Sequence, residues 1–519
     1  MWAIRADMRG DFSMSHDASL EPLFPIADIQ GDILVGLPKR HEHLMFFEVI
    51  DVPAFKEFLE RLDITSMQDC LRFRDEIAAQ KQVGNALIPT PGLNIAFTAA
   101  GLVRIGVSQV SGATGIDAFK GGMASRQAVL NDPPASSWRS LRPSKRLHGV
   151  FIVTGATHAE VANVMSLRLA PPGANGWRLI DEEVGQVRPE PVLGHEHFGY
   201  ADGVSQPGIR GRIAETVALN PGLKDSNGQD SEPDQAAPGQ DVLWPGEFVF
   251  GYPAQNPGAA SFPEKGPERT PPIPFMLNGS FLVIRRLAQL VPEFNASVRK
   301  ASQSLPASSD QADPDLLGAQ LVGRWKSGAA LIQAPTRDNR ALGDNTPDAN
   351  KFEFGDDREG LICPWAAHIR KTYPRDDVRH DTSPPQADVD RAEAFTQTHR
   401  MLRRGIAFGP ELTEEEALSG ISNGGDHTRG LLFKCYVTSI EGQFEFVQQQ
   451  WSNAADFSQE ESGIDPIIGQ SPSAVRPFRG AAPISRNVAR KPDLTLRSFV
   501  RMEGGEYFFA PSILALRSL

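Results

Sequence analysis

The stretch GHEHFGYADGVSQPGIRG, residues 194–211, places two histidines, a glutamate and an aspartate on a backbone rich in glycine. Gly199 and Gly203 flank Asp202 in this stretch. Glycine lets the backbone adopt unusual conformations and approach a ligand closely. Three interpretations are open for so many titratable groups on such a backbone: a metal site, a loop held by its own hydrogen bonds, and an acid–base catalyst.

The two histidines of this stretch are weak candidates for metal ligands. A zinc protease requires His-Glu-x-x-His on a helix, and the second histidine at that spacing is missing. His195 and His197 would need further zinc ligands, which the neighbouring sequence does not supply. A hydrolase that uses His195 with Asp202 lacks a nucleophile motif. Asp202 is the stronger candidate for a functional residue, because it is a carboxylate among small residues and is free to face a flat ligand.

The whole chain has an ordinary globular composition, with 519 residues, 40% hydrophobic residues and a net charge of -12. This length suits two or three domains or one duplicated unit. The negative charge argues against nucleic acid as the main partner. No run of 18 apolar residues predicts a membrane span, and the N-terminus lacks the apolar core of a signal peptide. Three widely spaced cysteines form no disulfide framework. We therefore expect a cytoplasmic protein, with export left open.

Strands and helices alternate in both halves of the sequence. HLMFFEVI (His43–Ile50) and LHGVFIVTG (Leu147–Gly155) are typical of strands, as are GSFLVIRRL (Gly279–Leu287) and RGLLFKCYVTSI (Arg429–Ile440). A helical pattern follows each of them, and a polar Gly/Pro-rich segment at 220–241 predicts a surface loop. This order predicts two α+β halves, each an antiparallel sheet with helices on one face.

Two further segments carry candidate functional residues. His368 lies in the apolar run CPWAAHIRKTYPR, directly before several cations. It is either a hydrogen-bonded core histidine or an iron ligand whose neighbouring cations meet haem propionates. The segment HRMLRRGIAFGPE carries Arg400, Arg403 and Arg404. These arginines form either a solvated basic face or a group directed at a peroxide or a propionate.

Several of these motifs together resemble one known family. GYADG fits the GxxDG signature of dye-decolourising (DyP-type) haem peroxidases, and HEHFGYADGVSQPGI is similar to the longer, fungal-like branch. CPWAAHIRKTYPR resembles that branch's proximal-histidine segment, and HRMLRRGIAFGPE its distal-arginine segment. Further similar landmarks are NGSFLVIRRLAQ, GRWKSGAAL, GLLFKCY and GIDPIIGQ. The resemblance runs from about Asp28 to the C-terminus.

The resemblance implies an α+β fold of two ferredoxin-like halves, each an antiparallel β-sheet with peripheral helices. Haem b would be held mainly by the C-terminal half. We expect a lead-in segment at residues 1–28 and an N-terminal half at 29–215 that carries GxxDG. The C-terminal half, 216–519, would carry the proximal histidine. The resemblance also suggests a homodimer.

The matching positions carry the family's roles onto this chain. The resemblance implies that His368 is the proximal iron ligand, Asp202 the distal acid–base group and Arg403 the distal arginine. An aspartate has an ordinary pKa of about 3.9 and is a competent base in mildly acidic solution. We therefore expect an acidic pH optimum.

The resemblance assigns five supporting residues. Leu431 and Phe433, which alternate on a strand, would line the distal pocket. Asp465 would accept a hydrogen bond from the second nitrogen of His368. Arg370 is expected to contact a propionate, and His195 to contact a propionate or to tune Asp202.

The function implied is that of a peroxidase, which uses hydrogen peroxide to oxidise dyes, phenols and other aromatic donors through a ferryl intermediate. The alternative is a haem-binding or haem-handling protein with incidental peroxidase activity. Asp202 and Arg403 favour the enzyme, because storage of haem needs neither. No nucleic acid or membrane partner is expected.

Bulky dyes cannot enter a small pocket and would need a surface site of electron transfer. Phe408 stands where the family can have a tyrosine, and phenylalanine is not readily oxidised. Trp451 in QQQWSN is the remaining candidate for surface electron transfer. A tryptophan packed on an amphipathic helix is an equally good interpretation.

Overall fold

The computed structural model describes most of the chain between residue 22 and the C-terminus. The described residues are 22–84, 86–144, 146–169, 175–211, 235–237, 240–258, 265–304, 313–344, 348–423, 428–471, 476–478 and 494–519. Residues 1–21 of the expected lead-in and the expected boundary between residues 215 and 216 lie outside them.

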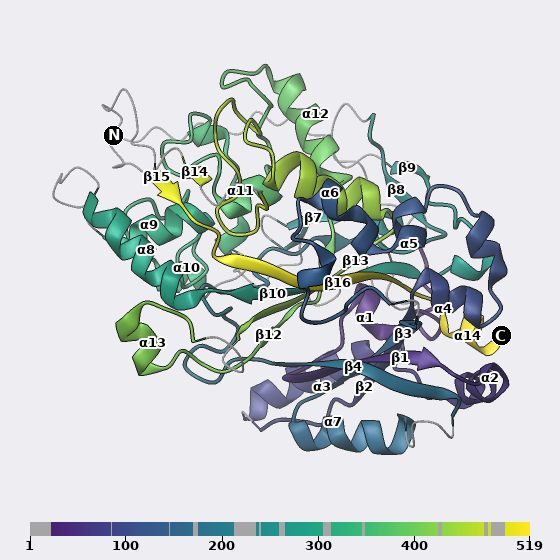
Figure 1. The fold of residues 1–519 in the computed structure, drawn as a ribbon. Helices are drawn as coiled ribbons and strands as arrows, with labels where there is room; N and C mark the ends of the chain where they lie inside the picture. The colour runs from purple at the N-terminus through teal and green to yellow at the C-terminus, as the bar shows by residue number, and fades with distance from the viewer. Residues whose placement is uncertain are drawn as a thin grey trace.

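One antiparallel sheet organises the molecule (Figure 1). Its strand order is β11-β13-β10-β16-β2-β3-β1-β4, and β12 also pairs with β13. The strands are β1 (His41–Val49), β2 (Gly92–Phe97), β3 (Gly149–Gly155), β4 (Trp177–Gln186), β10 (Ser280–Gln289), β11 (Leu402–Arg403), β12 (Ile406–Phe408), β13 (Gly430–Val437) and β16 (Val500–Ala510). The strands expected at 43–50, 147–155, 279–287 and 429–440 are therefore present as β1, β3, β10 and β13.

The sheet consists of two halves with the same topology. Numbered along the chain, the four strands of the first half lie in the spatial order second, third, first, fourth, and the second half repeats this order with β11 and β12 as its second strand. This is the order of a ferredoxin-like β-α-β-β-α-β unit. The halves join where β2 pairs with β16, at Phe97 and Phe509. The expected α+β fold of two ferredoxin-like halves is confirmed.

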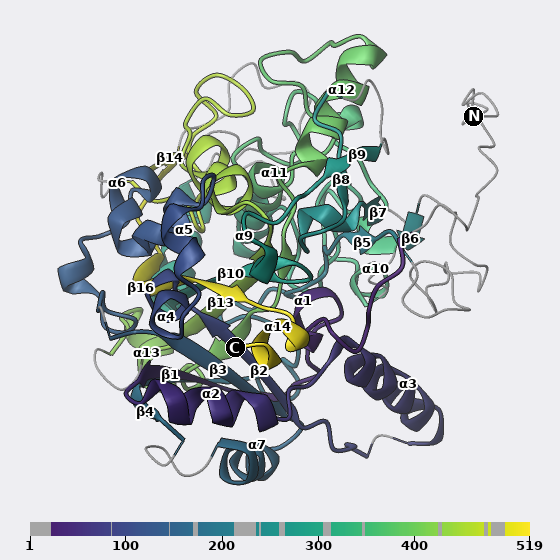
Figure 2. The same cartoon turned by 90° about the vertical axis from the view of Figure 1, so that its right-hand side faces the viewer.

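Helices cover the outer face of the sheet in both halves. Figures 1 and 2 show α2 and α7 together against the strands of the first half. The N-cap of α7 is Thr157, and its side chain accepts a hydrogen bond from the backbone N–H of Glu160. The helices are α1 (Gly31–Leu34), α2 (Val52–Arg61), α3 (Met67–Val83), α4 (Ala99–Arg104), α5 (Asp117–Gly121), α6 (Gln127–Leu130), α7 (His158–Val164), α8 (Val291–Ser304), α9 (Pro314–Val322), α10 (Arg340–Gly343), α11 (His368–Thr372), α12 (Gln386–Gln397), α13 (Glu414–Ser419) and α14 (Ile513–Arg517).

Short strands, 3-10 turns and π-helical turns complete the described structure. The short strands are β5 (Gly208–Ile209), β6 (Gln235–Ala237), β7 (Gln240–Leu243), β8 (Pro253–Gln255), β9 (Lys265–Glu268), β14 (Arg476–Phe478) and β15 (Leu494–Leu496). The helix expected after β13 forms as two π-helical segments, Ile440–Glu445 and Val447–Ser452. No helix in the described parts of the chain is long and apolar enough to cross a membrane.

Alternating side chains build two separate cores on the two faces of the sheet. On β1, Phe47 packs with the helices of the outer face, whereas Phe46 belongs to the inner core. The sheet curls until its ends approach each other, so that β4 lies beside β12. A side chain at Gly185 of β4 would collide with Ile406 of β12. The inner core is enclosed by this curl.

The last residues of the expected lead-in are part of the fold. Phe24 packs its ring 5.1 Å from that of Tyr252. Asp28 accepts a hydrogen bond of 2.7 Å from the backbone N–H of Leu514 at the start of α14. The chain thus enters the folded structure before residue 28.

Candidate active site

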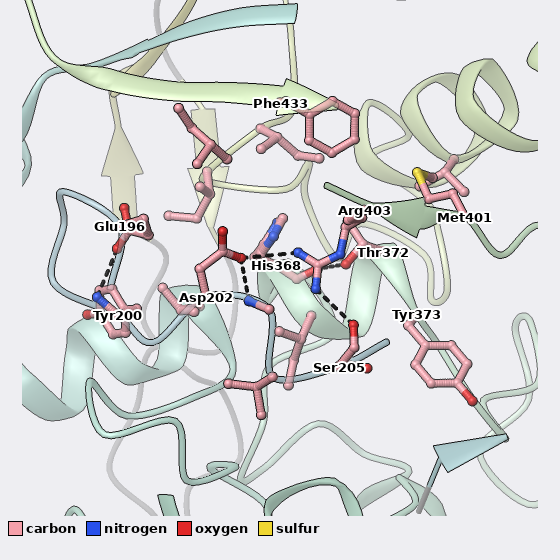
Figure 3. Close-up of a pocket in the computed structure, with 18 of the residues that line it drawn as sticks. Glu196, Tyr200, Asp202, Ser205, His368, Thr372, Tyr373, Met401, Arg403 and Phe433 are labelled. Carbon is pink, nitrogen blue, oxygen red and sulfur yellow. Dashed lines mark hydrogen bonds and ion pairs between the residues drawn. The ribbon is translucent and has the colours of Figure 1, made fainter. Parts of the chain in front are cut away.

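A cavity lies on the outer face of the C-terminal half, between β13 and the segments that cover it. Its volume is about 250 Å³, whereas a single water needs only about 10–15 Å³. Leu431 and Phe433 of β13 line it, together with Asp202, Arg403 and His368. Five residues expected at one site, from positions 202 to 433, therefore meet around one cavity. Figure 3 labels Asp202, His368, Arg403 and Phe433 among them.

Asp202 lies on an irregular loop that glycines make possible. Gly199 has φ +96° and Gly203 has φ +73°, a left-handed conformation that favours glycine. The Oδ1 atom of Asp202 accepts hydrogen bonds from the Gly203 backbone N–H (2.7 Å) and from Nη1 of Arg403 (3.3 Å). Within the described residues the second carboxylate oxygen, Oδ2, accepts none, so it is available to a bound molecule.

Glu196 holds the loop that precedes Asp202. Its two carboxylate oxygens accept hydrogen bonds of 2.8 Å from the backbone N–H groups of Phe198 and Tyr200, and Gln289 also donates to it. Burial raises the pKa of the Glu196 carboxyl, and the nearby charge of Asp202 adds to this shift. These bonds fix the loop path that sequence inspection left undetermined.

Arg403 enters the cavity from β11, an edge strand paired with β13. Its Nη2 donates to the Ser205 carbonyl at 2.8 Å, and its Nη1 makes the ion pair with Asp202. Figure 3 shows the guanidinium between these two partners. The distal acid and the distal arginine expected from the sequence are therefore in direct contact, although they come from different halves of the chain.

His368 is the first residue of α11 and faces the cavity with about a quarter of its side chain exposed, at 26%. Its Nδ1 lies 2.8 Å from Oδ2 of the fully buried Asp465. The other oxygen of Asp465 accepts from the backbone N–H groups of Ile467 (2.7 Å) and Ile468 (3.0 Å). A carboxylate fixed in this way keeps the proton on Nδ1, which leaves Nε2 as a lone-pair donor suited to a metal.

Comparisons with known proteins identify the family of the chain. The family model described as "DyP dimeric alpha+beta barrel domain" matches residues 28–189. "Peroxidase 2" of Mycetinis scorodonius is 33% identical over 95% of this chain and 87% of its own length. The chain belongs to the dye-decolourising peroxidase family. It is a peroxidase, and hence an oxidoreductase.

Solved structures of the family agree over nearly the whole fold. An ancestral D-type dye-decolourising peroxidase has a TM-score of 0.77 at 34% identity and covers 96% of this chain and 99% of its own. A dye-decolourising peroxidase in complex with 2,6-dimethoxyphenol has a TM-score of 0.74 at 30% identity, with the same coverage of both chains. The resemblance to the fungal-like branch noted in the sequence is confirmed.

Arg370 of this dye-decolourising peroxidase does not lie where the sequence argument placed it. It is fully buried and donates to Asp357, to Asp377 and to the Cys363 carbonyl. It does not line the cavity. Residues two apart on an α-helix point to nearly opposite sides, so Arg370 faces away from His368. The expected contact between Arg370 and a propionate is wrong.

The histidines of the opening motif also lie outside the cavity lining. His195 is half-buried, and its Nδ1 lies 3.0 Å from the Leu193 carbonyl. His197 is buried, and its Nε2 donates to the Phe408 carbonyl at 2.9 Å. The two imidazoles thus serve different local contacts and do not form a shared metal site. The expectation that His195 contacts a propionate or tunes Asp202 stays a prediction.

Trp451 is not a surface residue. Its side chain is buried at 2% exposure, and its ring stacks on Phe457 with centroids 5.4 Å apart. It also meets His399 edge-on at 5.3 Å. Phe408 is buried beneath the Arg286 guanidinium. The prediction of direct electron transfer at an exposed Trp451 is wrong, and the alternative of a packed tryptophan is correct.

Four more arginines line the cavity beside Arg403: Arg285, Arg324, Arg375 and Arg400. Sequence analysis offered Arg400 and the cations that follow His368 for such a role, but it did not single out Arg285 or Arg324. Arg400 lies in the segment already singled out, and its guanidinium stacks 3.4 Å from the ring centre of Tyr373. Arg375 closes the motif CPWAAHIRKTYPR, seven residues after His368. The signal for both was present in the quoted motifs, but only the fold shows which cations reach the cavity.

Dye-decolourising peroxidases are haem enzymes, and the side chains around this cavity fit that group. Five arginines line the cavity, and four of them form ion pairs: Arg285 with Asp132, Arg375 with Glu353, Arg400 with Asp241 and Arg403 with Asp202. Within the described residues Arg324 is buried with no carboxylate partner and donates to the carbonyls of Gly328 and Ala349. Burial and the nearby cations lower the pKa of Arg324 to about 9. A ligand that carries carboxylates would offset the buried positive charge of Arg324.

Proposed function

We propose that this chain is a haem b peroxidase in which Asp202 is the distal acid–base group and Arg403 the distal arginine. The observation that carries the proposal is the meeting of three residues at one cavity, Asp202 from a loop, Arg403 from β11 and His368 from α11. None of the three is explained by the packing of the fold alone, because each presents polar atoms to the cavity.

The residues that would hold the haem follow from their positions. His368 would bind iron through Nε2, since its Nδ1 is occupied by Asp465. Arg324, Arg375 and Arg400 would meet the propionates with charge-assisted hydrogen bonds. Leu431 would contribute to the apolar wall. Haem bound in this way supplies the redox chemistry that reduces hydrogen peroxide and oxidises the donor in one-electron steps.

Asp202 would move the proton of the peroxide. Its Oδ2, which is free of partners within the described residues, would accept the proton from one oxygen of hydrogen peroxide and deliver it to the other. Its Oδ1 is held by Gly203 and Arg403, so the carboxylate cannot rotate away. Because a carboxylate stays ionised in mildly acidic solution, we propose an acidic pH optimum.

Arg403 would stabilise negative charge on the leaving oxygen. A guanidinium keeps its charge at every working pH, and a cation fixed where negative charge develops stabilises that charge. The Ser205 carbonyl and Asp202 already aim its two terminal nitrogens. Little reorganisation is therefore needed when charge develops.

The donors would be phenols and other aromatic compounds. A solved relative is described in complex with 2,6-dimethoxyphenol, and the apolar Leu431 and Phe433 line the cavity here. Since Trp451 is buried, donors would be oxidised at the cavity or through another residue.

An absorption spectrum of the haem-loaded protein tests the proposal. We expect a Soret band that shifts when hydrogen peroxide is added. In His368→Ala the band should be lost or moved to that of free haem, whereas in the matched control His158→Ala, an exposed histidine outside the cavity, it should be unchanged. A wild-type spectrum that fails to respond to peroxide would overturn the proposal.

A further inference from the structure

The backbone of Arg403 lies at the outer edge of β11, the edge that does not pair with β13. The N–H and C=O groups of one strand residue point to the same side, and those of the next residue point to the other. The N–H of Arg404 donates to the Lys434 carbonyl of β13 at 2.7 Å. The N–H and C=O of Arg403 therefore point away from β13, at the free edge of the sheet.

The side chain of Gln206 occupies this edge. Its Nε2 donates to the Arg403 carbonyl at 2.9 Å, and its Oε1 accepts from the Arg403 N–H at 3.2 Å. A glutamine amide carries one donor group and one acceptor. Gln206 therefore repeats, with a side chain, the two-bond exchange that a neighbouring strand would make with Arg403.

The same short segment, residues 202–206, also holds the far end of the Arg403 side chain. The Ser205 carbonyl accepts from Nη2 at 2.8 Å, and Asp202 accepts from Nη1 at 3.3 Å. Arg403 is thus hydrogen-bonded at its backbone by Gln206 and at its guanidinium by Asp202 and Ser205. The segment belongs to the loop that carries the acid, whereas Arg403 belongs to the sheet of the other half.

We propose that Gln206 is a positioning residue that fixes Arg403 relative to Asp202. This inference rests on the proposed function, since it assigns Gln206 to the geometry of that site. Gln206 touches the backbone of Arg403 and none of the reacting atoms. Its importance follows from the tolerance of catalytic sites, in which groups must be held within about 0.5 Å of the productive geometry.

Three variants separate positioning from general stability. Gln206→Leu removes both hydrogen bonds to Arg403 at similar side-chain volume. Gln206→Glu keeps an acceptor for the Arg403 N–H but loses the Gln206 donor to the Arg403 carbonyl, which then keeps only Nη1 of Arg404 at 3.1 Å. The matched control is Gln333→Leu, because Gln333 also donates to two backbone carbonyls, those of Asp348 (2.9 Å) and Lys351 (3.0 Å), and does not line the cavity.

Amide hydrogen exchange on the purified proteins is the first measurement, and it does not depend on peroxide chemistry. In Gln206→Leu we expect the Arg403 amide to exchange about 10-fold faster or more, while the amides of β13 that pair with β10 keep their protection. Gln206→Glu should fall between this variant and the wild type. Gln333→Leu should leave the Arg403 amide unchanged.

Steady-state kinetics of the haem-loaded proteins is the second measurement. We expect kcat/KM for hydrogen peroxide to fall about 10-fold or more in Gln206→Leu, since an error of about 1 Å can cost about 100-fold. The KM for the donor should stay unchanged, and Gln206→Glu should recover part of the loss. Gln333→Leu should keep the wild-type value.

The outcomes distinguish this inference from the proposed function. Unchanged exchange at Arg403 in Gln206→Leu, or a kcat/KM for peroxide within about twofold of the wild type, overturns the positioning role. If Gln206→Leu does not fold, Gln206→Glu decides by the same two measurements. A wild-type protein that does not react with peroxide contradicts the proposed function. Hydrogen exchange at Arg403 then still tests whether Gln206 fixes the Arg403 backbone.

Discussion

At Asp202 the two carboxylate oxygens have different tasks. Oδ1 is tied to the Gly203 N–H and to Arg403, whereas Oδ2 faces the cavity without a partner among the described residues. This asymmetry gives the side chain a fixed orientation and leaves Oδ2 for the proton transfer that we propose. A loop stabilised only by its own hydrogen bonds, one of the interpretations of the opening motif, would not need a carboxylate in the cavity.

Asp202→Asn tests this division directly. The amide keeps the size of the side chain but cannot accept the proton, so we expect the rate of reaction with peroxide to fall about 10²- to 10⁴-fold. Stopped-flow absorbance at the Soret band measures this rate. Haem content and thermal stability should stay at the wild-type level, and Asp315→Asn, at an exposed ion pair with Lys326, is the matched control. A wild-type rate in Asp202→Asn would contradict its role as the base.

Asp465→Asn tests the partner of His368. The carboxylate lies 2.8 Å from Nδ1, and its charge makes the imidazole a stronger electron donor. We expect the variant to raise the reduction potential of bound iron and to lower the peroxide rate about 10- to 100-fold. Spectroelectrochemical titration measures the potential. An unchanged potential would show that Asp465 only orients the ring.

At the scale of one element, α11 shows why the sequence located His368 but misplaced its neighbour. The motif identified the segment, and proximity along the chain suggested Arg370 as the cation nearest the ligand. The helix, which starts at His368, turns Arg370 towards Asp357 and Asp377, whereas Thr372, at four residues from His368, lines the cavity. Helical periodicity could have excluded Arg370, but the start of a five-residue helix is not visible in the sequence.

The buried network of Arg370 anchors α11, and its removal should release the helix. Arg370→Met leaves Asp357 and Asp377 buried without their cation, so we expect the free energy of unfolding to fall by about 3–5 kcal/mol. Chemical denaturation and haem content measure the effect, since α11 carries His368. Arg391→Ala removes an exposed ion pair on α12 and should change stability by no more than about 0.5 kcal/mol. Equal stability of the two variants would contradict the anchoring role.

At the scale of the whole molecule, the sequence predicted the two halves because each strand shows its own local pattern. β1, β3, β10 and β13 are apolar runs of strand length, and they form where expected. The curl that brings β4 beside β12, and the meeting of β2 with β16, depend on residues hundreds of positions apart, such as Gly185 with Ile406. Such pairings leave no periodic trace in a single sequence.

His197 is one of the residues that join the halves, and it makes their contact sensitive to acid. It lies on the loop before Asp202, is buried at 5% exposure, and donates to the Phe408 carbonyl of β12. Burial, with a smaller effect of the nearby Arg188 charge, lowers the pKa of His197 from 6.5 to about 4. Between pH 6.5 and 4 the unfolded chain therefore binds a proton at this residue that the folded chain does not.

The direction in which stability changes with pH follows from this difference in proton binding. A group whose pKa is lower in the folded state stabilises the fold fully above its unfolded value, and this contribution is lost as the pH falls towards 4. A shift from 6.5 to about 4 corresponds to about 3 kcal/mol. We expect His197→Gln, in which the amide can still donate to Phe408, to make the free energy of unfolding less dependent on pH by about 1.4 kcal/mol per pH unit in this window.

Urea unfolding at several pH values between 4.5 and 7 measures this slope. His399 is also buried, and burial lowers its pKa to about 4, so a residual slope should remain in His197→Gln. His158→Gln, at an exposed position, should keep the wild-type slope. Parallel curves for His197→Gln and the wild type would show that His197 does not carry the acid sensitivity. If the slope falls as expected, the proposed acidic optimum would work against the stability of the contact between the halves, and folding as well as the proposed proton transfer at Asp202 would limit the pH range of activity.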